Sequence, residues 1–345
     1  PHIRVIKNQE VISKSVISSF AEDQDGNIWI GIENYGLEKF DPVNMKFIRE
    51  VAPWPISRIK AFATDQHNRH WMGTLYQGLW SIKNNEFKRW GTIAGIFSSV
   101  LAVDSGVWIG TRLSGLIYYD TVSDTFVQYR EGDRAIGSIS SDRVWKVFQD
   151  SRRNIWVCSD FGLSVKYRGA TDFENFYYNG SSNSLSRNQN YTITEDKDGK
   201  LWIGTAGAGI DIFDPETKVF HKFPSNTPIE NAEVYCILED HQSNKWFSTN
   251  QGLYVYYPHS QTIKEFSKRD GILGEQYHPN SGFVSSTGKL FFGGGNGFNL
   301  IDPTTVKQNP KAPEVFLSKL LINNRPLHEQ APKYVNAEFP AALNN

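Results

Sequence analysis

Four polar residues stand at the same distance before a tryptophan in four parts of the chain, namely Arg58, Arg143, Gln189 and Glu233. Aromatic and basic side chains are expected beside them: Tyr76, Arg112, Trp145 and Tyr191. Such a set offers aromatic faces, hydrogen-bonding groups and guanidinium groups, which suit a sugar, with arginine available for an acidic group. We therefore predict a ligand-binding site at these eight positions. The alternative is that they only line a water-filled channel.

Tyr277 and His278 form a second candidate binding site, because they lie in a long segment of variable composition. The pattern His67-x-x-His70 could touch a metal ion, but no third ligand is in view. We predict no metal and no cofactor. Cys158 and Cys236 fall in strand-like runs far apart in the sequence, so we expect two buried thiols and no disulfide.

An internal repeat defines the strands that carry these residues. The repeat reads DGNIWIG at 25–31, HNRHWMGT at 67–74, GVWIGT at 106–111, RNIWV at 153–157, DGKLWIGT at 198–205, SNKWF at 243–247 and TGKLFFG at 287–293. The equivalent aromatic residues are spaced by 42, 37, 48, 46, 44 and 45 residues. A unit of about 44 residues therefore occurs seven times.

Each unit contains four short β-rich runs separated by turn residues. In the first unit they are 16–21, 28–30, 37–40 and 46–50, with turns at 24–27, 33–36 and 41–42. Four antiparallel strands in each of seven units predict an all-β fold, a seven-bladed β-propeller. A solenoid is the alternative, but solenoid repeats rarely hold four strands.

The repeated aromatic residues have a structural explanation. A large ring on the second strand of every blade fills the space between neighbouring blades. We assign this role to Trp29, Trp71, Trp108, Trp156, Trp202, Trp246 and Phe291. The Asp-x-x-Gly segments before them are typical of turns.

Blades one to six have an aromatic fourth strand, whereas the seventh unit ends at Ile301-Asp302-Pro303 without one. The segment 2–7 (HIRVIK) is β-rich, and we predict that it pairs with the strand near 297–301 and closes the ring. The alternative is an unpaired remnant of a preceding domain. We expect the propeller to occupy residues 1–309 and a second, truncated domain to begin at 310–345.

Composition excludes some partners. The 36 Lys and Arg residues nearly balance 37 Asp and Glu residues, giving a formal charge of −1, so nucleic acid and anionic lipid are poor partners. No segment approaches the ~18 uninterrupted apolar residues of a membrane span. We expect a soluble piece of a longer protein.

The motifs resemble one known family. The string DGKLWIGT at 198–205, with Gly209-Ile210 and Phe213-Asp214-Pro215 after it, resembles the two-component regulator propeller repeat of bacterial membrane sensors. The segments DGILGEQY at 270–277, LFFGG at 290–294 and NGFN at 296–299 are similar to the final blade of such sensors. The segment APEVFLSKLLINNRPL at 312–327 resembles the opening of the immunoglobulin-like three-tyrosine domain that follows.

The resemblance implies a periplasmic ectodomain of an inner-membrane receptor. In that family a membrane helix and a cytoplasmic histidine kinase follow, with a diguanylate cyclase in some relatives, and many members sense an oligosaccharide. It also implies contact with a neighbouring propeller and with the immunoglobulin-like domain. The chain stops before the tyrosines that name that domain, and no kinase is encoded here.

Three classes of function stay open. The first is direct carbohydrate sensing. The second is a relay or homodimer contact without a ligand, for which Trp54, Trp80 and Trp90 could supply an apolar face.

The third class is an enzyme similar to propeller lyases or sialidases. Five histidines are expected away from the variable loops: His67, His70, His221, His241 and His259. An arginine cluster could form from Arg58, Arg112, Arg143 and Arg187, but no Tyr and Glu pair can be assigned to it. We predict no catalytic residues.

Overall fold

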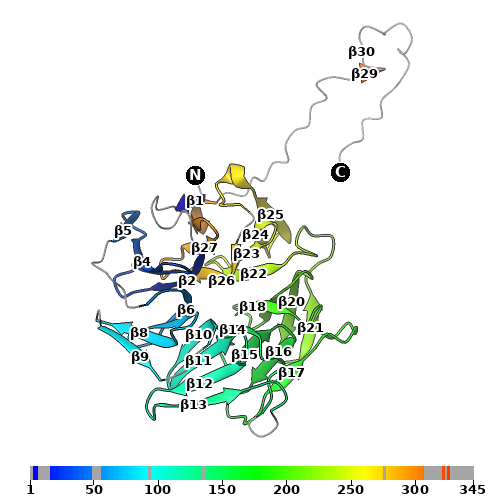
Figure 1. The fold of residues 1–345 in the computed structure, drawn as a ribbon. Helices are drawn as coiled ribbons and strands as arrows, with labels where there is room; N and C mark the ends of the chain where they lie inside the picture. The colour runs from blue at the N-terminus through cyan, green and yellow to red at the C-terminus, as the bar shows by residue number, and fades with distance from the viewer. Residues whose placement is uncertain are drawn as a thin grey trace. The chain divides into compact units, whose positions relative to one another are not determined.

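The computed structural model describes residues 3–6, 16–48, 56–84, 86–91, 95–133, 137–274, 277–306, 321–322 and 325–326. Seven four-stranded antiparallel sheets are arranged around a common centre, as Figure 1 shows. Apart from strands, the described elements include only two short 3-10 helices, η2 (Lys268–Asp270) and η3 (Pro303–Thr305). The predicted seven-bladed propeller is confirmed.

Within blades one to six, the chain runs from the innermost to the outermost strand. The inner strands neighbour one another around the centre, and the fourth strands lie at the rim (Figure 1). The bounds are β2 (Ile17–Glu22), β3 (Ile28–Ile32), β4 (Gly36–Asp41) and β5 (Lys46–Ile48) in blade 1; β6 (Ile59–Thr64), β7 (His70–Thr74), β8 (Leu79–Lys83) and β9 (Glu86–Trp90) in blade 2; β10 (Phe97–Val103), β11 (Gly106–Thr111), β12 (Leu116–Asp120) and β13 (Thr125–Tyr129) in blade 3; β14 (Val144–Gln149), β15 (Ile155–Ser159), β16 (Gly162–Lys166) and β17 (Glu174–Phe176) in blade 4; β18 (Asn190–Glu195), β19 (Leu201–Thr205), β20 (Ile210–Asp214) and β21 (Val219–Lys222) in blade 5; β22 (Val234–Glu239), β23 (Lys245–Thr249), β24 (Gly252–Tyr257) and β25 (Thr262–Phe266) in blade 6; and β26 (Tyr277–Val284), β27 (Leu290–Gly294) and β28 (Gly297–Ile301) in blade 7.

An N-terminal strand completes blade 7. Strand β1 (Ile3–Ile6) pairs antiparallel with β28, with Ile3 opposite Ile301 and Ile6 opposite Phe298. Residues from the two ends of the propeller therefore share one sheet. The predicted closure is confirmed for residues 3–6; residues 2 and 7 lie outside the described part.

Seven hydrophobic cores hold the blades together, and each contains one of the repeated aromatic residues. Trp156 of blade 4, for example, packs with Ile193 and Leu201 of blade 5. Phe291 of blade 7 packs with Ile17 and Phe20 of blade 1 across the closure. The anchors are all buried: Trp29, Trp71, Trp108, Trp156, Trp202, Trp246 and Phe291. Each ring thus fills the space between two blades, where burial of a large aromatic group is most stabilising.

An aspartate six residues before the anchor links the first turn to the tryptophan in four blades. Asp150 accepts hydrogen bonds from Trp156 Nε1 and from the backbone N–H of Asn154, both at 2.8 Å. The same tryptophan bond recurs at Asp65, Asp196 and Asp240. In these four blades the turn residue three before the anchor takes a positive φ, for example +75° at Gly199, which glycine adopts without strain. The repeat therefore encodes both the turn and the orientation of the indole.

Both cysteines are buried free thiols. Burial raises the pKa of the Cys158 thiol to about 12, because the apolar surroundings disfavour the thiolate, which is the reactive form. We expect neither thiol to react with a disulfide reagent at pH 8 while the protein is folded. Both should react in about 6 M guanidinium chloride, which unfolds even stable domains. Rapid labelling of the native protein would contradict the buried positions.

The chain divides into two units after Val306. In the second unit the described residues form one short pairing, β29 (Leu321–Ile322) with β30 (Arg325–Pro326). The rest of the predicted immunoglobulin-like segment lies outside the described residues, so its identity stays a prediction. No helix in the described part of the chain has the length and apolar character needed to cross a membrane.

Candidate functional site

Every inner strand of blades 1–6 contains one β-bulge near its start. In β14, for example, the register breaks between Val144 and Lys146, so Trp145 is left without a paired partner in β15. The bulge residues are Ser18, Lys60, Ser98, Trp145, Tyr191 and Tyr235. A bulge turns a side chain away from the regular alternation of a strand. Because the inner strands neighbour one another, these six residues, which we call the bulge ring, surround the channel at one level.

The four polar residues of the sequence prediction lie two positions before the bulge. The backbone carbonyl of Arg143 accepts the N–H of Asp160 at 3.0 Å, and that of Gln189 accepts the N–H of Ala206 at 3.0 Å. Arg58 and Glu233 make the same bond with Leu75 and Asn250. Their predicted equivalence is therefore confirmed. The residue after each second strand is brought beside the channel entrance by the same hydrogen bond.

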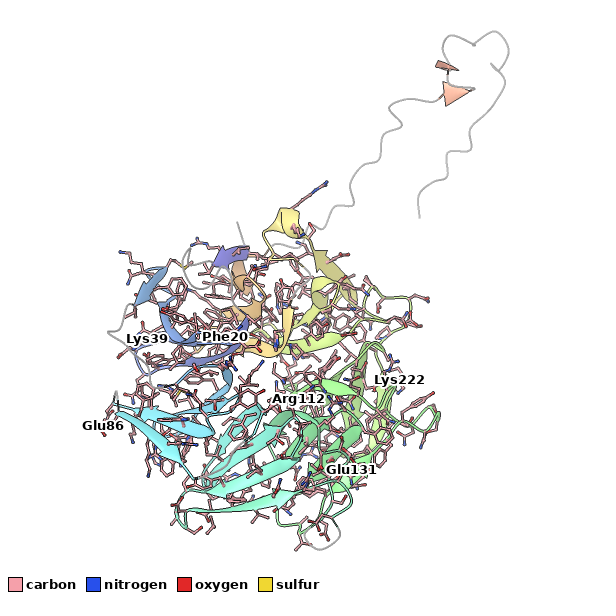
Figure 2. The ribbon with its side chains drawn as sticks, in the orientation of Figure 1. Phe20, Lys39, Glu86, Arg112, Glu131 and Lys222 are labelled. Atoms are coloured by element: carbon pink, nitrogen blue, oxygen red, sulfur yellow. The ribbon has the colours of Figure 1, made fainter. Side chains whose placement is uncertain are left out.

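An aromatic wall forms one side of the bulge ring. The rings of Trp145 and Tyr191 meet edge to face at 4.6 Å and 85°, and those of Tyr191 and Tyr235 lie 5.6 Å apart. The Arg112 guanidinium stacks 3.4 Å from the centre of the Trp145 ring. Figure 2 shows Arg112 toward the middle of the blade ring, whereas Glu86 and Lys222 lie at the rim. We refer to Trp145, Tyr191 and Tyr235 as the aromatic wall.

Asp160 connects the wall to the polar residues around it. Its carboxylate accepts hydrogen bonds from Trp145 Nε1 at 2.5 Å and from Gln189 Nε2 at 3.1 Å, and it pairs with Arg143 Nε at 3.1 Å. Three side chains of blades 4 and 5 are thereby fixed around one carboxylate. Asp160 was absent from the predicted site, although it stands four residues after Trp156, as Arg112 does after Trp108.

The phenols of the wall are neutral donors at physiological pH. Burial, with smaller contributions from Glu233 and Asp160, raises the pKa of Tyr191 to about 12. Burial and a hydrogen bond to Glu233 raise the pKa of Tyr235 as well. Burial lowers the pKa of Arg112, but arginine stays protonated in proteins. Its Nη1 is buried and has no hydrogen-bond partner among the described residues.

A second polar cluster lies on the other side of the ring. Lys60 Nζ pairs with Glu33, whose other carboxylate oxygen lies 4.0 Å from His278 Nε2. Burial and the nearby Lys60 charge lower the pKa of His278, so the imidazole is neutral at pH 7. His278 thus faces a salt bridge of blades 1 and 2. The sequence prediction had not connected these three residues.

The structure brings six of the ten predicted residues together: Arg112, Arg143, Trp145, Gln189, Tyr191 and Glu233. Arg58 and Tyr76 lie on exposed loops of blade 2, where no contact described in the structure joins their side chains to the wall. Tyr277, the ninth predicted residue, lies apart from the wall. It is buried in the core of blades 6 and 7, and its hydroxyl donates to Asn299 Oδ1 at 2.7 Å.

The described residues include no group of three or more His, Cys, Asp or Glu side chains that could hold a metal ion. His70 was expected in a solvated turn, but it is buried at the start of β7, where its Nδ1 lies 2.9 Å from Thr64 Oγ1. Trp90, a candidate for an apolar surface, is buried against Trp71 in an inter-blade core. Trp80 is half-buried, and Trp54 lies outside the described residues.

Two hollows adjoin the bulge ring. The first is a cavity of about 410 Å³ in the channel, with Ser18, Lys60, Ser98 and Asn280 on its lining. The second is a recess of about 520 Å³ beside Asp160, lined also by Tyr178, Arg187 and Gln189. Both volumes are in the range of small-molecule sites. The wall offers flat apolar faces, and the lining of each hollow offers polar side chains; the two hollows share no lining residue.

Comparisons with known proteins agree with this architecture. The family described as two component regulator propeller matches residues 11–34 and 184–207. The chain is 25% identical over 337 residues to histidine kinase P4 of Formosa agariphila, covering 91% of this chain and 24% of that protein. The resemblance to two-component regulator propellers is therefore confirmed. The chain spans about a quarter of the length of this curated relative.

Solved structures share the fold. The extracellular domain of a putative hybrid two component system from B. thetaiotaomicron has a TM-score of 0.78 and 20% identity, with 92% of this chain and 43% of that chain covered. An inactive virginiamycin B lyase from Staphylococcus aureus, solved with quinupristin, has a TM-score of 0.67 and 10% identity. The match covers 86% of this chain and 98% of the lyase chain. At these identities the likeness concerns the fold alone.

Proposed function

We propose that this propeller is the sensor region of a bacterial membrane receptor, placed outside the cytoplasm, and that it binds an oligosaccharide at the channel mouth. The observation that carries the proposal is the aromatic wall of Trp145, Tyr191 and Tyr235 with Asp160 behind it. Aromatic faces bind the apolar sides of sugar rings, and fixed polar groups orient hydroxyls. In the longer protein, a histidine kinase is the proposed output, as in the F. agariphila relative.

A thermal-shift screen of neutral, acidic and sulfated oligosaccharides tests this proposal. A ligand that binds only the folded protein stabilises it by RT ln(1 + [L]/Kd), so above Kd the melting temperature rises with the logarithm of the ligand concentration. We expect at least one oligosaccharide to raise the melting temperature. Tyr235→Ala should raise the Kd for that sugar about tenfold or more, because the wall loses one ring.

The matched control is Phe126→Ala, which removes an exposed aromatic side chain from the rim strand β13. This variant should respond to the sugar as the unmodified protein does. Absence of any response across the three classes of sugar would contradict direct sensing.

A second candidate function is contact between two copies of the propeller. Tyr35, Tyr76, Leu113 and Phe161 are exposed, and each lies in the loop after the second strand of blades 1–4. Large apolar groups repeated along one face are typical of an interaction surface. Light scattering over a range of protein concentrations tests this candidate, and a monomer at all concentrations would argue against it.

A further inference from the structure

We propose that the channel cavity beneath the bulge ring receives the carboxylate of an acidic sugar, with the Lys146 ammonium as its charge partner. The inference rests on the proposed sugar site and specifies its ligand as a sugar acid. Its starting point is the geometry of β14, where Lys146 directly follows Trp145 of the aromatic wall. Lys146 lines the cavity of about 410 Å³, so one strand supplies both the ring face and the cation.

Among the described residues, the charged groups around the cavity leave Lys146 without a counter-ion. Lys60, the other lining lysine, pairs with Glu33. Glu22, the carboxylate on the lining, accepts hydrogen bonds from the backbone N–H and the hydroxyl of Ser286, both at 2.7 Å. Lys146 Nζ makes a long hydrogen bond of 3.4 Å to Thr192 Oγ1, and within the described residues no carboxylate forms an ion pair with it.

Lys146 is half-buried and lines the cavity, and a lysine ammonium without an acidic partner favours an anion next to it. The chain as a whole has a formal charge of −1, so this preference is a property of the cavity and not of the molecule. At the mouth, Arg112 stacks on Trp145 and adds a positive charge close to the carboxylate of Asp160. The preference for an acidic ligand therefore rests on Lys146 and not on the charge of the mouth.

Two unpaired polar atoms in the lining of the same cavity, an amide oxygen and a hydroxyl, favour a ligand that also carries hydroxyl groups. Asn280 Oδ1 and Ser19 Oγ are buried and have no partner among the described residues, and both residues line the cavity. Asn280 is held in place because its Nδ2 donates to the Trp145 carbonyl at 2.7 Å. Buried polar atoms are normally hydrogen-bonded, and ligand hydroxyl groups would supply the missing partners. A simple inorganic anion offers neither several hydroxyl donors nor a ring face for the wall.

The test is a set of calorimetric titrations with two matched pairs of probes, D-glucuronate against D-glucose and D-galacturonate against D-galactose. We expect the acid of at least one pair to bind about tenfold or more tightly than its neutral counterpart, and added NaCl to reduce the difference. Lys146→Met should abolish the preference for the acid, while Lys146→Arg, which keeps the charge, should retain part of it. Lys88→Met, on the rim strand β9, is the matched control and should change nothing.

The outcomes separate this inference from the proposed function. Equal binding of acid and neutral sugar by the unmodified protein would overturn the carboxylate site and leave the sugar site standing. A preference that survives Lys146→Met would overturn the role of Lys146. No binding of any of the four probes would overturn the carboxylate site, while the oligosaccharide screen decides the sugar site separately. If Lys146→Met fails to fold, Lys146→Gln provides the same comparison, and circular dichroism melting without ligand checks each variant.

Discussion

Trp156→Ala is expected to lower the free energy of unfolding by about 3–5 kcal/mol, the usual effect of removing a buried aromatic side chain. Trp156 has no exposed surface and packs between blades 4 and 5. Its ring lies 5.5 Å from Phe213 and 6.4 Å from Phe176. The deletion would leave a large cavity between two rigid sheets, which cannot collapse into it without breaking strand pairing.

Trp156→Phe separates the contribution of the ring from that of the indole N–H. Phenylalanine keeps most of the apolar contact, but Asp150 Oδ2 loses its 2.8 Å hydrogen bond. We expect the free energy of unfolding of this variant to fall by about 1–3 kcal/mol, because a buried polar group is left without one partner. Trp80→Ala is the matched control, since Trp80 is half-buried, and it should lose less than Trp156→Ala.

Urea unfolding followed by far-ultraviolet circular dichroism measures all three variants. The expected order of stability is unmodified protein, Trp156→Phe, then Trp156→Ala. A loss below about 1 kcal/mol for Trp156→Ala, the range of surface substitutions, would mean that the anchor does not hold the blades together.

The fold was predictable because it repeats. Because one pattern occurs seven times, the strand order can be inferred from each copy, and one irregular unit does not hide the order. The missing fourth strand of blade 7 stood out only against six complete units. The link between the anchor and the aspartate six residues earlier was not predicted, because Asp-x-x-Gly is typical of any turn and its bond to the indole depends on tertiary geometry.

The candidate site was predictable only in part. Counting from the anchors located the channel entrance, since backbone position repeats with the blades. The buried position of Tyr277 was not predictable, because blade 7 breaks its register between Tyr277 and Gly282, a longer irregularity than the single bulges of the other blades. Tyr235 and Asp160 were missed, although both stand at repeat positions equivalent to chosen residues. Their partners come from other blades, and side-chain contacts between blades do not follow from spacing.

Removal of residues 1–6 is expected to destabilise the propeller by more than any single substitution in β1. Without β1, the edge of β28 would lose its partner strand and expose unpaired backbone groups. Ile3 would also leave the core that it shares with Phe266 and Ile301.

Ile3→Ala alone should lower the free energy of unfolding by about 2–5 kcal/mol, because the side chain is almost fully buried. Arg4→Ala, at an exposed position of the same strand, is the matched control and should lose less than about 0.5 kcal/mol.

A synthetic peptide of residues 1–8, added to the shortened protein, gives the decisive measurement. If β1 stabilises the ring by completing blade 7, the peptide should raise the melting temperature of the shortened protein, and it should do so increasingly with peptide concentration. A peptide with Ile3→Asp should have no such effect, because a charged group would be buried in the core. If the shortened protein is as stable as the full chain, the remaining three strands of blade 7 are sufficient without β1. Closure through the N-terminal strand would then contribute little to the free energy of unfolding.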